Sequence, residues 1–211
     1  MVYRATEFTE NSKAQTRERL LKESKKLVSQ AGFRGLSIAE AARCSAIATG
    51  TVYRYFPSKS ELCVAVFEQA TQREIDAVSQ AGTTAHSATQ RLRSSLECFI
   101  QRALQNPTLA YALIAEPVDP ELEQTRLIYR AHWAESFSTL IRLGIEQGEF
   151  IPQPETLCAT ALVGAMAETV IIPLQQARHD ANTDTTPLTQ SHCQQIVAFC
   201  LRAVVKPEHI V

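Results

Sequence analysis

The chain of 211 residues contains little glycine and proline, 7 and 9 residues respectively, and several of the prolines fall where helices would begin or end. Because these two residues are the main interruptions of regular structure, long stretches without them favour helices over a β fold with many turns. Hydrophobic residues make up 45% and charged residues 20% of the chain, as in a globular protein rather than a disordered one.

Motifs of common enzymes and of metal sites are also missing. No glycine-rich phosphate loop, HExxH or GxSxG occurs, and the polar residues after the first quarter of the chain are scattered. The 6 cysteines include no CxxC pair, and His192 beside Cys193 has no second ligand pair at zinc-finger spacing. We therefore expect no catalytic residue, no cofactor and no metal, and a protein that is not an enzyme.

The N-terminus shows no secretory signal pattern, so we expect the cysteines to be reduced thiols of a cytoplasmic protein, most of them buried. A redox switch between Cys193 and Cys200 is the weaker alternative. Two residues seven positions apart on a helix are too distant for an intrahelical disulfide.

No segment has the pattern of a convincing membrane span. The most apolar stretch, residues 157–174, is interrupted by Glu168 and Thr169 and closed by Pro173. A helix buried in an interface between helices explains this composition better than a membrane-spanning helix. We therefore expect no membrane partner.

Charge is divided unevenly along the chain, although the net charge is only −1. Residues 1–60 contain 11 Lys/Arg and 5 Asp/Glu, whereas residues 61–211 contain 10 and 17. A basic first quarter joined to an acidic remainder indicates a module that binds a polyanion, attached to a body that does not. The alternative is a scatter of charge over two solvated surfaces.

The pattern of apolar residues, caps and breakers predicts an all-α fold, with a three-helix head continuous with a helical body. Ser37 and Ser58 each open a helix with capping-box spacing, because Glu40 and Glu61 follow three positions later. Gly32 is expected to end the first helix. The polar segment 179–190 is expected to be a loop. The predicted helices cover residues 12–31, 37–44, 49–55, 58–79, 87–105, 108–115, 121–147, 154–176 and 188–205.

Residues 36–62 are the most informative about function. They predict two short helices joined by a tight turn, the unit that places its second helix in the major groove of DNA. Such a helix needs apolar anchors on one face and short polar or basic side chains on the other. The buried side is expected to contain Ala41, Ala42, Ile47, Val52 and Phe56, and the exposed side Thr49, Thr51 and Arg54.

The run from Thr49 to Lys59 resembles the TetR family of bacterial transcriptional regulators, in which a short recognition helix ends in an aromatic pair and is followed by a turn and a lysine. The Ala31-Gly32-Phe33 ending and Ser37 fit as well, and the resemblance covers residues 12–70. It implies a helix-turn-helix DNA-binding domain at residues 1–58. It also implies a helical ligand-binding and dimerisation domain at residues 59–211.

The resemblance further implies which side chains contact DNA. Arg54 is the best candidate for reading a guanine, and the amides that open the fourth helix favour a phosphate. The alternatives are a core aromatic at Tyr53 and a solvated surface lysine at Lys59. Phosphate contacts are expected from Ser37, Tyr53, Tyr55 and Lys59, and base-edge contacts from Thr49, Gly50, Thr51 and Arg54.

Two positions depart from the family pattern. Ala46 replaces the usual glycine of the turn, and Ala48 replaces the usual Ser or Thr cap of the recognition helix. A lost cap costs about 1 kcal/mol, and an alanine with positive φ is strained. Either the turn differs in geometry or Thr49 takes over as the cap.

The last two helices are expected to form a homodimer interface, since operators are palindromic and a single head binds weakly. Their small and apolar residues would be buried in a four-helix arrangement from two chains. The alternative is that these faces pack only within one chain. The residues concerned are Ala159, Ala161, Gly164, Ala165 and Ala167 on one helix, and Ile196, Val197, Phe199, Cys200 and Val204 on the other.

A small hydrophobic or aromatic effector is expected to bind in the body, in a pocket lined by apolar residues with few polar ones. Each candidate has the alternative role of a simple core residue. A regulator that answers to a protein partner or to no effector, and a helical ligand-binding protein with an incidental helix-turn-helix, are the competing functions. The candidates are Phe99, Ala103, Tyr111, Ile114, Trp133, Phe137 and Met166, with Glu168 as polar partner.

Overall fold

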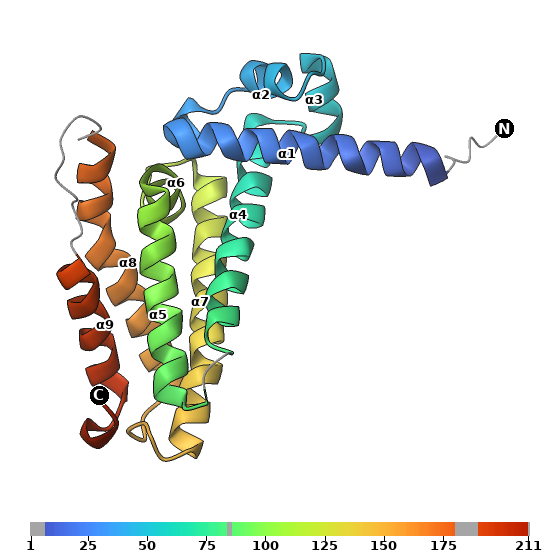
Figure 1. Ribbon diagram of the computed structural model, residues 1–211. Helices are drawn as coiled ribbons and strands as arrows, with labels where there is room; N and C mark the ends of the chain where they lie inside the picture. The colour runs from blue at the N-terminus through green and yellow to red at the C-terminus, as the bar shows by residue number, and fades with distance from the viewer. Residues whose placement is uncertain (1–6, 84–85, 180–189, 211) are drawn as a thin grey trace.

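The computed structural model describes residues 7–83, 86–179 and 190–210 (Figure 1). The described residues are helical apart from turns and one isolated bridge between Phe150 and Val205, which confirms the all-α prediction. The elements are α1 (Glu7–Gly35), α2 (Ile38–Cys44), α3 (Thr49–Tyr55), α4 (Lys59–Ala81), α5 (Ala88–Gln105), α6 (Pro107–Ile114), α7 (Pro120–Glu146), α8 (Glu155–His179), α9 (Gln190–Val204) and the 3-10 turn Pro207–His209.

Side-chain caps begin the helices where the sequence predicts. Ser37 Oγ accepts a hydrogen bond from the Glu40 amide at 3.2 Å, and Ser58 Oγ accepts one from the Glu61 amide at 3.1 Å. Each cap satisfies a backbone amide that has no partner within its helix. Ser87, Asn106 and Asp119 cap α5, α6 and α7 in the same way.

The first helix is longer than predicted. It begins at Glu7, ahead of the expected start near Ser12, and resumes beyond a kink at Gly32 to end at Gly35. Gly32 has φ of 70°, so the expected break falls at the expected residue, but helix follows it. Most of the predicted loop at 179–190 lies outside the described residues.

The head consists of α1, α2 and α3, and α4 runs from it into the body (Figure 1). In the figure α1 lies across the top of the bundle, with α2 and α3 on its outer side and the other helices running down from it. The head core also takes in Leu109, Leu113 and Leu122 from α6 and α7. Head and body therefore share one continuous apolar contact beneath α1.

Helix α8 contains a long apolar stretch. Among the described residues it is the one helix long and apolar enough to cross a membrane, a test that core helices of soluble proteins also pass. Only 28% of its most apolar window is buried within the chain. The predicted helix is confirmed, but much of its apolar surface is not covered by this chain.

Candidate nucleic-acid interface and small-molecule cavity

The turn between α2 and α3 has the geometry of a glycine C-cap although an alanine occupies it. The Ile47 amide donates to the Ala42 carbonyl at 3.0 Å, and the Ala46 amide donates to the Arg43 carbonyl at 3.1 Å. These two bonds define a Schellman motif, whose left-handed residue is Ala46 with φ of 53°. The expected strain at Ala46 is therefore present.

The recognition helix α3 begins without a side-chain cap. Ala48 occupies the cap position with φ of −70° and ψ of 147° and forms no side-chain hydrogen bond there. Thr49 is the first helical residue, so the alternative that Thr49 replaces the missing cap is wrong.

Helix α3 has one buried and one exposed face. Val52 and Phe56 are buried in the head core, while Thr49 and Arg54 are exposed. Tyr53 is 50% exposed, so its alternative role as a core aromatic is wrong. Thr51 and Tyr55 are half-buried, and Tyr55 packs against the head core.

No contact within the described part of this chain requires glycine at position 50. It is an exposed helical residue, and a Cβ placed there would meet no atom within 4 Å. Since glycine weakens a helix, a surface glycine in this place points to a requirement from outside the chain, such as close approach by another molecule.

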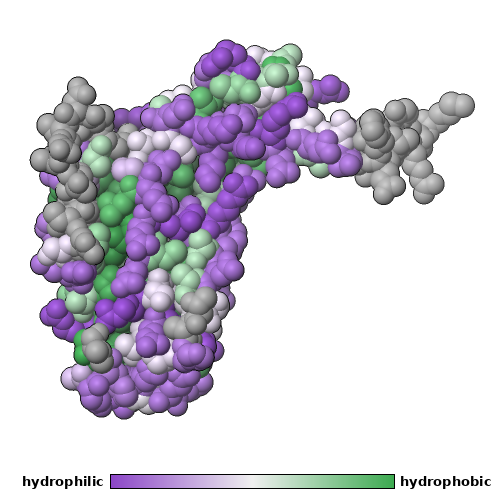
Figure 2. All heavy atoms as spheres, viewed as in Figure 1, coloured by the Kyte–Doolittle hydropathy of each residue, from purple (hydrophilic) through white to green (hydrophobic). Residues whose placement is uncertain are grey.

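The remaining phosphate candidates lie at helix N-termini. Ser37 Oγ accepts from the backbone as a cap, and its hydroxyl proton is still able to donate. Lys59 is exposed in the first turn of α4, where the helix dipole also favours an anion. Figure 2 shows that the surface over α1 is largely hydrophilic.

One buried carboxylate joins the body to the head. Glu116 follows α6, is 3% exposed, and accepts hydrogen bonds from the Phe33 amide at 2.9 Å and the Arg34 amide at 3.2 Å. A Cβ at Gly32 would lie 2.6 Å from both carboxylate oxygens. Glycine is therefore required at this kink for two reasons: the backbone has a positive φ, and Glu116 occupies the space of a Cβ.

Buried Arg126 in α7 holds the end of α6 in place. Its guanidinium donates to the carbonyls of Leu113 at 3.1 Å, Ala112 at 3.2 Å and Glu116 at 2.8 Å, and it pairs with Glu123. Burial lowers the pKa of Arg126, and these carbonyls compensate the buried charge. Arg126 also lines the cavity described next, so hydrogen bonds connect the cavity wall to the Gly32 kink.

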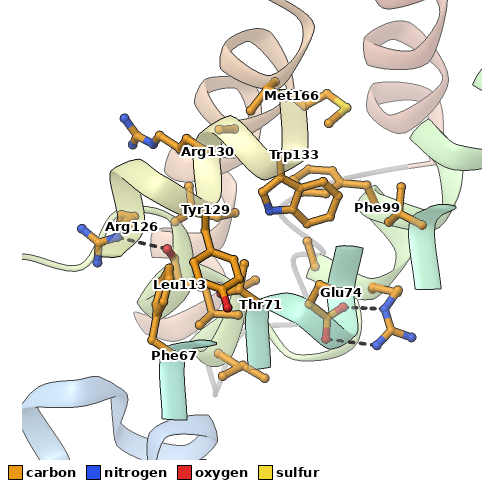
Figure 3. Close-up of a pocket in the computed structure, with 18 of the residues that line it drawn as sticks. Phe67, Thr71, Glu74, Phe99, Leu113, Arg126, Tyr129, Arg130, Trp133 and Met166 are labelled. Atoms are coloured by element: carbon orange, nitrogen blue, oxygen red, sulfur yellow. Dashed lines mark hydrogen bonds and ion pairs between the residues drawn. The ribbon is translucent and has the colours of Figure 1, made fainter. Parts of the chain in front are cut away.

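A cavity of about 740 Å³ lies inside the bundle, between α4, α5, α6, α7 and α8 (Figure 3). Two edge-to-face aromatic pairs line it: Phe99 with Trp133, and Phe67 with Tyr129, at centroid distances of 5.8 and 5.7 Å. Lys25 and Ser29 of α1 reach its wall as well. A helix of the head therefore forms part of the cavity.

Most of the predicted effector contacts meet at this cavity. Tyr111 and Phe137 do not line it: the Tyr111 hydroxyl accepts from Gln175 at 3.0 Å, and Phe137 is buried in the body core. His132 is exposed with its ring against Tyr129. The predicted residues that line the cavity are Phe99, Ala103, Ile114, Trp133, Met166 and Glu168.

Sequence reasoning missed the polar part of the cavity wall. One signal was present: Phe67, Thr71, Glu74 and Val78 recur at helical spacing on α4 and line the cavity together. Thr71 is 5% exposed, and its hydroxyl has no hydrogen-bond partner among the residues that the structure describes. Lys25 had no such signal, because only the tertiary fold brings α1 over the body.

Neither Cys193 nor Cys200 is disulfide-bonded, and all six cysteines are free. Burial raises the pKa of Cys200 to about 11 and also raises that of Cys193. Both thiols are therefore protonated and poorly nucleophilic near neutral pH, which argues against a redox switch between them.

Exposed apolar side chains are found on α8 and α9. Leu157 and Ile172 on α8 are 67% and 64% exposed, and Phe199 on α9 is 60% exposed. Figure 2 shows hydrophobic side chains gathered in a band on the α8 side of α5. Ala159 and Val197 are buried inside the chain, but Ala161 and Gly164 remain exposed.

The head matches a known family. Residues 20–66 match the family model described as bacterial regulatory proteins, tetR family. This segment is a TetR-family domain. The resemblance seen in the recognition helix is thereby confirmed, as is the arrangement of a helix-turn-helix head on a helical body.

Curated relatives of this chain are transcription regulators. It is 29% identical over 101 residues to the HTH-type transcriptional regulator SAB2452 of Staphylococcus aureus (strain bovine RF122 / ET3-1), covering 48% of this chain and 55% of that protein. It is 28% identical over 109 residues to the HTH-type transcriptional repressor KstR of Mycolicibacterium smegmatis, covering 51% and 53%. The matches thus span about half the length of these relatives.

Solved structures resemble this chain over most of its length. A putative TetR-family regulator from Rhodococcus sp. has a TM-score of 0.73 at 19% identity, covering 92% of this chain and all of that one (100%). FadR from Bacillus subtilis, solved in complex with stearoyl-CoA, has a TM-score of 0.68 at 18% identity, covering 85% and 97%. At such identities the likeness concerns the fold.

Proposed function

We propose that this protein is a transcriptional regulator, most simply a repressor, that binds a palindromic operator as a homodimer and is released by a small apolar or aromatic molecule. One observation carries the proposal: a helix with an exposed polar face stands at one end of a molecule whose helical body contains a cavity of about 740 Å³ directly beneath the head. Residues 1–58 would form the DNA-binding domain and residues 59–211 the effector and dimerisation domain. We expect a cytoplasmic, non-enzymatic protein.

The DNA contacts follow from the exposed face of α3. Thr49, Gly50 and Arg54 are exposed there and would meet base edges together with Thr51. Tyr53 and Lys59 flank that face and would bind phosphates, with Ser37 and Tyr55 in support. Phosphate contacts would set the position of the head, and base contacts would select the sequence.

Dimerisation is supported by the uncovered apolar surface of α8 and α9. Exposed Leu157, Ile172 and Phe199 lie on these two helices, with exposed small residues on α8 that permit close packing. Burying this surface against a second copy would remove apolar side chains from water. It would also place two recognition helices together, as a palindrome requires.

The effector would act by shifting the position of the head. It would bind better to a body conformation in which α4 is displaced, moving the two recognition helices away from successive major grooves about 34 Å apart. Lys25 and Glu116 supply contacts between body and head through which such a shift would be transmitted. The cavity favours a small molecule over a protein partner as effector, because a body that answers to a protein partner needs no internal space.

The first experiment is selection of random duplex DNA by the purified protein. Enrichment of a sequence with two inverted half-sites is expected, and recovery of no enriched sequence would contradict operator binding. Substituting Arg54→Ala should then weaken binding to the selected site by about 1–3 kcal/mol while sparing non-specific DNA. An equal loss on all sequences would assign Arg54 to the phosphates instead.

A further inference from the structure

One end of the cavity carries an excess of positive charge. Lys25 and Ser29 of α1 line it there, close to Arg102 of α5. Arg73 of α4 lies near enough to Lys25 to act on its charge. Two cations, Lys25 and Arg102, therefore line this end, and a third, Arg73, lies near it.

The nearby carboxylate is already engaged. Glu74 forms a two-bond ion pair with Arg102, one bond measuring 3.0 Å, which Figure 3 shows at the cavity wall. Among the residues that the structure describes, no carboxylate lies within ion-pair distance of the Lys25 ammonium. Lys25 is thus a half-buried cation whose charge is not matched by a direct partner.

The electrostatic surroundings of Lys25 disfavour its charge. Burial is the main cause that lowers its pKa, and the positive charges of Arg73 and Arg102 add to it, while Glu74 acts in the opposite direction. A negative group in the cavity would offset each of these penalties.

Much of the cavity wall away from Lys25 is apolar and aromatic, although Arg126, Arg130 and Glu168 line it as well. Phe99, Trp133 and Met166 form this part, and buried Thr71 offers one hydroxyl without a partner. Figure 3 shows Tyr129 and Trp133 of α7 facing α4, where Thr71 lies. A ligand that fits both ends needs an apolar body and a charged group at one side.

We propose that the cavity binds an anionic amphiphile, whose negative group is held by Lys25 and whose apolar body lies along Phe99 and Trp133. This inference rests on the function proposed above, because it names the chemical class of the effector. Lys25 belongs to α1, seven residues before the Gly32 kink. A ligand anchored there contacts head and body at once, which links occupancy of the cavity directly to the position of the head.

The test uses two probes that differ by one negative group: 1-anilinonaphthalene-8-sulfonate and its neutral counterpart N-phenyl-1-naphthylamine. The chain has a single tryptophan, Trp133 in the cavity wall, so quenching of its fluorescence reports binding at this site. Lys25→Gln should weaken the sulfonate about tenfold, equivalent to about 1.4 kcal/mol, and leave the neutral probe within about twofold. Lys22→Gln, an exposed lysine of α1 outside the cavity lining, is the matched control and should change neither affinity.

An equal loss of affinity for both probes in Lys25→Gln would mean that Lys25 only shapes the cavity, and would overturn the proposal. Unchanged sulfonate binding would overturn it as well, because the anion would then lie elsewhere. Neither measurement involves DNA, so failure of the charge preference is distinguishable from failure of operator binding. If no DNA sequence is enriched but Lys25→Gln still weakens only the sulfonate probe, the anion site is supported and the regulatory function is contradicted.

Discussion

Ala46 is the residue at which the head departs most from relaxed backbone geometry. Its φ of 53° belongs to the left-handed region, where a Cβ crowds the backbone. Two Schellman hydrogen bonds and the packing of Ile47 on the head core hold it there. Because the strain is local, its removal should raise the free energy of unfolding without changing the fold.

Ala46→Gly is therefore expected to raise the free energy of unfolding by about 0.5–1 kcal/mol, because glycine adopts this conformation without strain. Urea denaturation followed by circular dichroism measures the change. The matched control is Ala39→Gly, the same replacement at an exposed position inside α2, which should lower stability by about as much. Equal destabilisation by both would show that Ala46 is not strained.

A substitution at Gly50 is expected to affect the stability of the fold and the affinity for DNA in opposite directions. Gly50→Ala should leave stability unchanged or raise it by up to about 1 kcal/mol, because the added methyl group meets no atom and alanine favours the helix. Affinity for the selected operator should nevertheless fall, since the methyl group would enter the space of the DNA. Titration of the operator in a fluorescence anisotropy assay checks this. Unchanged affinity would mean that DNA does not approach Gly50 closely.

At the scale of elements, the end of α6 is the junction between cavity and head. Arg126 binds its carbonyls from one side, and Glu116 binds the amides of Phe33 and Arg34 from the other. The Glu116 contacts join segments more than 80 residues apart in the chain. The α4 helix provides a second route, since it begins in the head and lines the cavity.

Glu116→Gln should loosen this junction, because an amide offers one oxygen where the carboxylate offers two to the Phe33 and Arg34 amides. An unsatisfied buried donor costs about 1–3 kcal/mol. Hydrogen exchange at Phe33 and Arg34 should therefore accelerate by about tenfold or more in mass spectrometry of that segment. Glu121→Gln, an exposed acid in the first turn of α7, is the control and should leave both amides protected. Unchanged protection in Glu116→Gln would show that the junction does not depend on the carboxylate.

At the scale of the whole molecule, charge and apolar surface are separated. The first 60 residues hold the excess of basic side chains, whereas the remainder is acidic and carries the exposed apolar side chains of α8 and α9. An acidic body is repelled by DNA, which favours contact through the head alone.

Phe199→Glu is expected to convert a dimer to a folded monomer, because the new charge would be buried against a like charge at a twofold interface. Sedimentation velocity measures the mass, and circular dichroism confirms the fold. Tyr53→Glu, which adds the same charge at an aromatic residue of the head that is 50% exposed, should remain a dimer while losing DNA affinity. A Phe199→Glu protein that sediments as the wild type would exclude this face as the interface.

Local chemistry in the sequence was enough to predict the helices and the exposed face of α3. Caps such as Ser37 and Ser58 act within four residues, and the apolar spacing of Val52 and Phe56 sets which side of α3 is buried. Such signals depend only on neighbours in the chain, so they can be recognised without knowledge of the fold. The start of α1 was missed because Ser12, a residue type typical of helix N-caps, lies inside the helix.

Only the tertiary structure decided what lies at the cavity and what joins it to the head. Lys25 of α1 and Glu116 after α6 come from distant parts of the chain, and nothing local distinguishes them from ordinary helix or loop residues. Their burial and their partners arise from contacts between segments distant in sequence. Sequence alone therefore determined the all-α fold and the exposed face of α3, while packing between helices decided which charges line the cavity and which contacts join it to the head.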